Sequence, residues 1–111
     1  MSDLFLKERY HSQLTDIFNH CCPNAVIWAY GSRVGGKAHS GSDLDLAIKD
    51  LGKNALTIPM IRAVLDESTL PFRVDLHVFD WLPKSFQEEI KRKYIVFYGE
   101  EKQDTSNEVK K

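Results

Sequence analysis

The sequence predicts an α/β fold: a small mixed sheet with helices on one face. Two segments, 43–49 and 73–79, alternate apolar and polar residues, which is the period of a half-buried strand. Segments 3–22, 58–68 and 83–94 place apolar residues three or four apart, which is the period of an amphipathic helix. With 111 residues, the chain has room for one hydrophobic core.

The first half of the chain predicts a helix, a strand and a loop. The apolar residues of the first helix are Leu6, Tyr10, Leu14, Ile17, Phe18 and Cys21. Pro23 ends that helix, and the apolar run 25–30 predicts a buried strand. Gly31 ends the strand, and the polar, glycine-rich segment 33–42 predicts a loop or one irregular helical turn.

The second half predicts a strand, a helix, a strand and a last helix. The core-facing residues of the two strands are Leu44, Leu46, Ile48, Val74, Leu76 and Val78. Trp81 follows the second of these strands; burial in the core is favoured for it, and a contact with a partner is the alternative. Pro83 begins the last helix, in which Phe86, Ile90, Tyr94 and Phe97 lie three or four residues apart. We expect one domain over residues 1–99 and a disordered tail over 100–111, where the composition turns polar.

Composition and charge exclude several classes of protein. Fifteen Lys and Arg against sixteen Asp and Glu give a formal charge of -1, so direct binding to nucleic acid is not expected. No apolar run approaches the roughly 18 residues of a membrane-spanning helix. The N-terminus has no signal-peptide pattern. We therefore expect a cytoplasmic protein without a membrane partner.

Three aspartates lie on the polar faces of the predicted strands. Asp43 and Asp45 are two residues apart on one strand, so both side chains point the same way, and Asp75 lies on another strand. Carboxylates this close repel one another unless a cation binds between them. Mg²⁺ prefers carboxylate and phosphate oxygens, and three carboxylates can hold two such ions for phosphoryl chemistry. The pattern therefore predicts a divalent metal site, with solvated strand faces as the alternative.

Gly31 and Ser32 predict an anion site beside these carboxylates. Glycine permits a turn in which backbone N–H groups approach an anion closely, and a serine hydroxyl can donate to a phosphate oxygen. A plain turn is the alternative. If both sites exist, the metal ions and the phosphate share one rim.

The Gly31-Ser32 pair, ten intervening residues and Asp43-Leu44-Asp45 resemble the Gly-Ser-x10-Asp-x-Asp signature of the minimal nucleotidyltransferases of the DNA polymerase beta superfamily. This spacing arises by chance in about one chain in a thousand of this length. The resemblance covers residues 24–99 and implies a polymerase beta palm-like fold. Its further matches are Arg33, Gly36, Ala38, Ser42, Val74-Asp75-Leu76 and segment 90–98, which is similar to the closing helix of the family.

The resemblance implies transfer of a nucleoside monophosphate from a nucleoside triphosphate to a hydroxyl group. ATP, which would supply AMP, is the expected substrate, and another NTP is the alternative. Asp43, Asp45 and Asp75 would be the catalytic residues and the ligands of two Mg²⁺ ions, with Mn²⁺ as an alternative. Asp43 and Asp45 would hold the ions at the triphosphate, and Asp75 the ion that activates the acceptor hydroxyl. The implied nucleotide-binding residues are Gly31, Ser32, Arg33, Lys37 and Ser42.

Many similar minimal members are antitoxins encoded beside a helical HEPN-type ribonuclease toxin, which they bind and adenylylate on a tyrosine. A chain of this size has no separate acceptor-binding domain, so a HEPN-type partner or a second copy would present the acceptor in a hetero- or homo-oligomer. Gly35 and His39 stand where the family often has basic residues. They favour the alternative function, a catalytically weak nucleotide-binding module that acts on a helical partner by binding alone.

Overall fold

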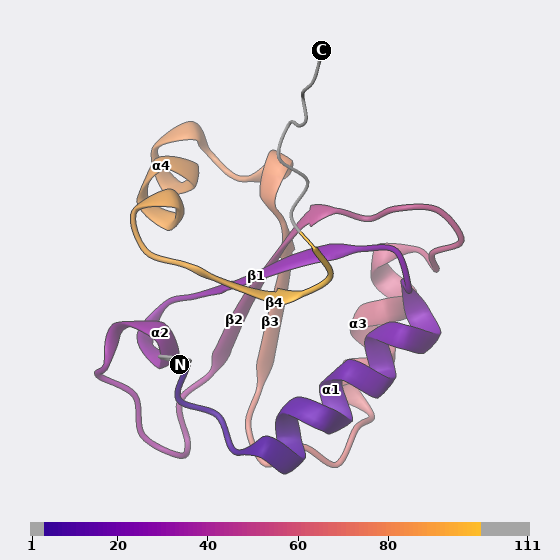
Figure 1. Ribbon diagram of the computed structural model, residues 1–111, viewed down its shortest axis with the longest axis horizontal. Helices are drawn as coiled ribbons and strands as arrows, with labels where there is room; N and C mark the ends of the chain where they lie inside the picture. Colours follow the sequence, from indigo (N-terminus) through magenta and orange to yellow (C-terminus); the bar gives the residue numbers. More distant parts are fainter. Residues whose placement is uncertain (1–3, 101–111) are drawn as a thin grey trace.

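The computed structural model of the protein describes residues 4–100 and has the α/β fold that the sequence predicts (Figure 1). Its elements are α1 (Glu8–Cys21), β1 (Val26–Tyr30), α2 (Ser32–Gly35), β2 (Leu44–Asp50), α3 (Ile58–Asp66), β3 (Val74–Val78), the 3-10 turn η1 (Phe79–Trp81), α4 (Lys84–Arg92) and β4 (Ile95–Tyr98). The tail predicted over 100–111 lies, from residue 101 on, outside the described residues. None of the helices in the described range is both long and apolar enough to cross a membrane.

The four strands form one mixed sheet in the order β3-β2-β1-β4. β1 is antiparallel to both β2 and β4, whereas β2 and β3 are parallel and joined through α3. A parallel pair needs a crossover connection of this kind. This topology places β2, with Asp45, in the middle of the sheet beside β3, with Asp75.

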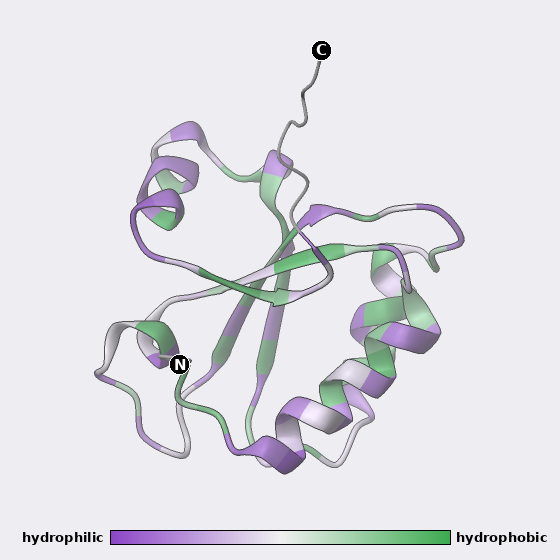
Figure 2. Ribbon diagram, viewed as in Figure 1, coloured by the Kyte–Doolittle hydropathy of each residue, from purple (hydrophilic) through white to green (hydrophobic). Residues whose placement is uncertain are grey.

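The main core lies between one face of the sheet and the helices α1 and α3 (Figures 1 and 2). Its fully buried side chains include Leu14 and Phe18 of α1, Ile61 of α3, and Leu44 and Leu46 of β2. The strand positions are those that the alternating pattern assigned to the core. The site-bearing positions of β2 and β3 therefore point to the other face.

That other face carries α4, which corrects the expectation of helices on one face only. A second buried cluster contains Trp28 and Tyr30 of β1, Ala47 of β2, Phe79 of η1 and Ile90 of α4. β1 is apolar on both faces because helices cover both of them, which explains its continuous apolar run. The consequence for function is that α4 forms a wall beside the polar strand positions.

The fourth strand was not predicted, because segment 90–98 was expected to be a closing helix. α4 ends at Arg92, and Ile95–Tyr98 pairs with β1 instead. The spacing of Tyr94 and Phe97 imitates a helix, but all four residues of β4 are β-branched or aromatic and favour a strand. The expected start of the first helix at residue 3 was also too early, since α1 begins at Glu8.

Candidate active site

Three side chains lie in a row across the sheet. The backbone register pairs Tyr30 of β1 with Asp45 of β2, and Asp45 with Asp75 of β3. Residues directly opposite each other on neighbouring strands point to the same face, so both carboxylates project on the side of α4. Asp43 is exposed and lies just before β2. The register thus brings together two of the three predicted carboxylates and leaves Asp43 at the entrance of β2.

Burial raises the pKa of the Asp45 carboxyl, and the negative charges of Asp75 and Asp43 raise it further, while His77 acts in the opposite direction. Within the described residues, no hydrogen-bond donor pairs with this carboxylate. Asp45 is therefore a half-buried acid without a hydrogen-bond donor to stabilise its negative charge, and His77 offsets the effect of the neighbouring carboxylates only in part.

Asp45→Asn is expected to raise the Tm at neutral pH. A pKa raised on folding means that the folded chain holds this proton more tightly than the unfolded chain. The stabilisation from the group is therefore present at acid pH and lost as the pH rises through the folded-state pKa, which leaves a net cost that Asn removes. Thermal unfolding of both proteins between about pH 4 and pH 8 measures the effect. A Tm difference that does not grow with pH contradicts it.

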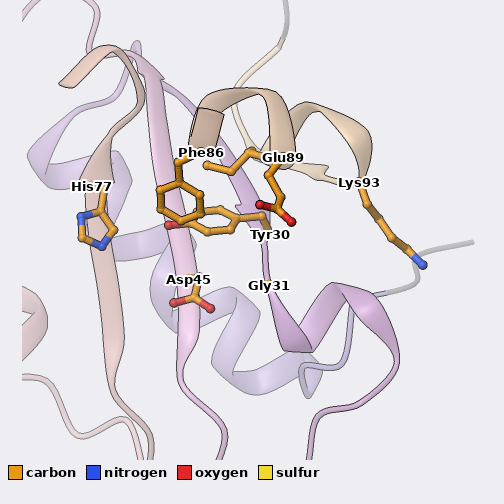
Figure 3. Close-up of a pocket in the computed structure, with 8 residues that line it drawn as sticks. Tyr30, Gly31, Asp45, His77, Phe86, Glu89 and Lys93 are labelled. Atoms are coloured by element: carbon orange, nitrogen blue, oxygen red, sulfur yellow. The ribbon is translucent and has the colours of Figure 1, made fainter. Parts of the chain in front are cut away.

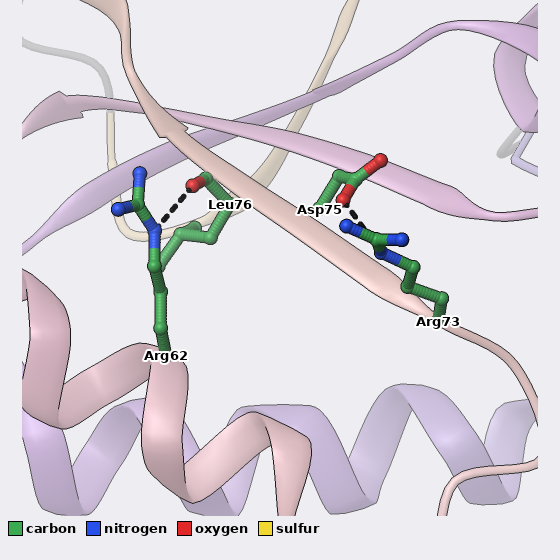
Figure 4. Close-up of polar contacts among 4 residues, drawn as sticks. All are labelled: Arg62, Arg73, Asp75 and Leu76. Atoms are coloured by element: carbon green, nitrogen blue, oxygen red, sulfur yellow. Dashed lines mark hydrogen bonds and ion pairs between the residues drawn. The ribbon is translucent and has the colours of Figure 1, made fainter.

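Asp75 has a partner that the sequence analysis missed. Arg73 Nε donates to Asp75 Oδ1 at 3.0 Å, with 74% of the Arg73 side chain and 29% of the Asp75 side chain exposed (Figure 4). The signal was present, since residues two apart on a strand share a face. An exposed pair of this kind stabilises by about 1 kcal/mol or less, so a stronger ligand can displace Arg73. Arg62 of α3 contacts the same strand, because its Nε donates to the Leu76 carbonyl of β3 at 3.0 Å.

Gly31 and Ser32 lie at the start of α2, directly beside Asp45. Gly31 has φ 84° and is exposed, as is Ser32. A Cβ atom at Gly31 would collide with Asp45 Oδ2. The glycine is thus required both by its backbone conformation and by the close approach of the carboxylate.

The other residues predicted to bind nucleotide lie on α2 and the following loop. Lys37 is exposed there, and Ser42 Oγ accepts a hydrogen bond from the His39 backbone N–H at 3.0 Å. Arg33 is only 3% exposed and donates all its hydrogen bonds to backbone carbonyls. The Arg33 guanidinium is therefore taken up by the protein's own backbone, and nucleotide binding by Arg33 stays a prediction.

A cavity of about 430 Å³ opens beside Asp45, between the sheet and α4 (Figure 3). Its residues are Tyr30, Gly31, Asp45, His77, Phe86, Glu89, Ile90 and Lys93. The rings of Tyr30 and Phe86 meet edge to face with centroids 5.8 Å apart. Burial, Asp45 and Asp75 raise the pKa of Tyr30 to about 12, so its hydroxyl stays protonated at neutral pH.

The residues that α4 contributes to this cavity were missed, because the helices were expected on the opposite face. Tyr30 could have been found, since the alternation along β1 places it on the face opposite Ala29. His77 lies two residues after Asp75 on β3, so it faces the same way, and it lines the cavity. The cavity joins an apolar wall to the Asp45 carboxylate, a combination suited to a ligand with a flat organic part and a charged part.

The site offers oxygen ligands of the kind that a hard divalent cation prefers. Asp45 and Asp75 are adjacent carboxylates, and the charge of Asp75 raises the pKa of Asp45 because the two repel each other. Within residues 4–100, no three His, Cys, Asp or Glu side chains lie close enough to hold one metal ion together. The pair from β2 and β3 is therefore the part of the predicted ligand set that the protein assembles by itself.

Comparison with known proteins gives concordant matches. The family described as polymerase beta, nucleotidyltransferase, matches residues 12–103. The chain is 38% identical over 104 residues to the probable protein adenylyltransferase MntA of Haemophilus influenzae, across 91% of this chain and 90% of that one. A crystal structure described as a toxin-antitoxin with AMP-PNP matches with a TM-score of 0.63 and 19% identity, across 81% of this chain and 73% of that chain. The last match concerns the fold alone.

Proposed function

We propose that this chain, which belongs to the polymerase beta nucleotidyltransferase family and is a nucleotidyltransferase, transfers AMP from ATP to a hydroxyl of a partner protein as an antitoxin. The observation that carries the proposal is the row of Asp45 and Asp75 beside Gly31 and Ser32. A phosphate held at Ser32 lies next to the carboxylates that would bind the metal ions. The chain's 38% identity to a protein adenylyltransferase supports AMP and a protein as the transferred group and the acceptor.

The polar residues of the site have distinct tasks in this proposal. Asp43 and Asp45 would hold Mg²⁺, or Mn²⁺, at the triphosphate, and Asp75 a second ion at the acceptor. When bound, such ions stabilise negative charge on the phosphates and lower the pKa of the acceptor hydroxyl. The acceptor oxygen bonds to the α-phosphorus as the bond to pyrophosphate breaks, and the hydroxyl proton is released. Ser32 would donate to a phosphate oxygen, and Arg73 would leave Asp75 free when the ion binds.

Mg²⁺ or Mn²⁺ together with ATP is expected to raise the Tm by about 10 °C at a hundredfold excess over Kd. The physical reason is that a ligand of the folded state alone stabilises it, and that this ligand neutralises Asp45 and Asp75. Thermal melts with EDTA, with metal alone and with metal plus ATP measure the shift. The same melts on Asp45→Asn provide the control, which should show little shift. An unchanged Tm in the wild-type protein at millimolar metal and ATP counts against the site.

A separate protein would present the acceptor. Residues 4–100 form one four-stranded sheet with its helices, and a solved structure of similar fold is described as a toxin-antitoxin. Trp81, which the sequence favoured as a core residue, is 71% exposed in η1, between β3 and α4, both of which carry site residues. An exposed tryptophan is a frequent anchor in protein interfaces. We propose a HEPN-type helical toxin encoded beside this chain as the partner, with a tyrosine as the acceptor.

The test combines the purified chain, labelled ATP, Mg²⁺ and the product of the neighbouring gene. Label should pass to the partner, and peptide mapping should place the adduct on a tyrosine. Asp43→Asn is the matched control and should leave the partner unlabelled. The binding-module alternative, which the exposed Gly35 and His39 favour, stands instead if the partner is inhibited without an adduct and Asp43→Asn inhibits it equally.

A further inference from the structure

Arg33 is a buried cation that the proposed chemistry does not use. Its Nε donates to the Ser42 carbonyl at 2.9 Å, its Nη2 to the Ser40 carbonyl at 3.0 Å, and its Nη1 to the Phe5 carbonyl at 2.7 Å. Its own carbonyl accepts from the Phe5 N–H at 2.8 Å. A single side chain thus ties α2 to the N-terminal segment and to the loop that leads into β2.

Two aromatic rings complete the surroundings of this guanidinium. Its Cζ lies 4.4 Å from the ring centre of Phe72 and 5.6 Å from that of Phe5. Burial lowers the pKa of Arg33, and the charge of Asp43 acts in the opposite direction. Arginine nonetheless remains charged in proteins, so the carbonyl dipoles and the ring faces must compensate for the lost hydration.

The segments that meet at Arg33 are those that carry the active site. Ser32 precedes it on α2, Ser42 directly precedes Asp43, and Phe72 lies shortly before β3. The starts of β2 and β3 are in turn joined by a hydrogen bond from the Leu44 N–H to the Arg73 carbonyl, at 2.8 Å. The loop between α2 and β2 is rich in glycine, so its backbone needs fixed contacts of this kind to hold one conformation.

We propose that Arg33 is a positioning residue that fixes Ser32 relative to Asp43 and Asp45 by clamping the loop 36–43 against α2. A planar guanidinium can direct three donors at three carbonyls while its faces stack on Phe5 and Phe72. A lysine ammonium has the charge but neither the fixed fork nor the flat faces. The part of the proposal that concerns nucleotide binding rests on the proposed function, and the part that concerns the loop does not.

Arg33→Lys is the test variant, and Ile61→Ala is its control for general destabilisation. Ile61 is fully buried on α3, which lies on the far side of the molecule from α2 (Figure 1). The first readout is amide hydrogen exchange at His39, Gly41 and Ser42, whose N–H groups are hydrogen-bonded within the loop. The second is the Kd for ATP with Mn²⁺.

Arg33→Lys should speed exchange in the loop and raise the Kd, each by about tenfold, because it loses at least one hydrogen bond to a charged group. Ile61→Ala should leave the loop exchange rates and the Kd within about twofold of the wild-type values, even if its Tm falls as much as that of Arg33→Lys. Equal changes in the two variants, or no change in Arg33→Lys, overturn the proposal.

If Arg33→Lys does not fold, Phe72→Leu decides, since it removes one ring and keeps all three hydrogen bonds. Its loop exchange should rise about threefold, and an unchanged rate overturns the proposal. If the wild-type protein binds no ATP, the proposed function fails, and loop exchange alone decides the role of Arg33.

Discussion

Asp45→Asn is expected to lower nucleotidyl transfer by about a thousandfold or more while the protein stays folded. Asp45 is the central residue of the row across the sheet, and it is the carboxylate on which burial and the charges of Asp75 and Asp43 act together. The amide has nearly the same size but no negative charge to hold a divalent ion. Because the ionised carboxylate destabilises the folded state, its removal should cost activity without costing stability.

The measurement is the initial rate of label transfer to the partner at saturating ATP, with the Tm of each variant recorded beside it. Asp43→Asn and Asp75→Asn should show comparable losses of activity. Asp16→Asn makes the same chemical change on the exposed surface of α1, which packs on the opposite face of the sheet, and should retain the wild-type rate within about twofold. Unfolding of all three site variants would mark these aspartates as structural residues. A folded Asp45→Asn protein that keeps a tenth or more of the wild-type rate would contradict the proposed role.

The placement of Asp45 and Asp75 was predictable because the period of a strand is two. Leu44, Leu46 and Leu76 identify the buried face, and the face of the aspartates follows from them without knowledge of the tertiary structure. The parallel register that sets Asp45 directly opposite Asp75 did not follow, since it depends on α3 and on the contact between the starts of β2 and β3. Local pattern therefore assigns a face, and long-range packing assigns the neighbour.

The differences between the sequence analysis and the structure have one physical origin. Phe86, Ile90, Tyr94 and Phe97 have helical spacing, yet Phe97 belongs to β4, where pairing with β1 outweighs the local period. α4 was expected beside α1 and α3, although the aromatic residues Trp28 and Tyr30 on the other face of β1 required a cover of their own. Arg33 was expected to face a nucleotide because it follows Ser32, whereas its guanidinium is buried against backbone carbonyls. Sequence specifies charge and period, but the direction of a long side chain is decided by the partners that the fold brings to it.

Gly31→Ala is expected to reduce both stability and transfer severely. The backbone of Gly31 has φ 84° and ψ -157°, a region that essentially only glycine adopts and that costs another residue roughly 1–3 kcal/mol. The added Cβ would also meet Asp45 Oδ2 in the folded state, so either the strand end or the carboxylate must move. Moving Asp45 separates it from Asp75, and moving the strand end displaces Ser32. The addition of one methyl group thus disturbs the turn proposed to bind phosphate and the carboxylates proposed to bind metal together.

Three further variants separate these causes when the Tm and the transfer rate are measured in parallel. Gly35→Ala is the matched control on the same short helix, because nothing lies within 4 Å of its added Cβ, and it should be neutral or slightly stabilising. Ser32→Ala should leave the Tm unchanged and weaken nucleotide binding by roughly 1.5–3 kcal/mol, the contribution of one hydrogen bond to a charged group. In an Asp45→Ala background, Gly31→Ala should lower the Tm less than in the wild type, since the colliding oxygen is gone and only the cost of the backbone conformation remains. If Gly31→Ala lowers the Tm equally in both backgrounds, the carboxylate is not what the glycine accommodates, and the close approach of Gly31 to Asp45 has no part in building the site.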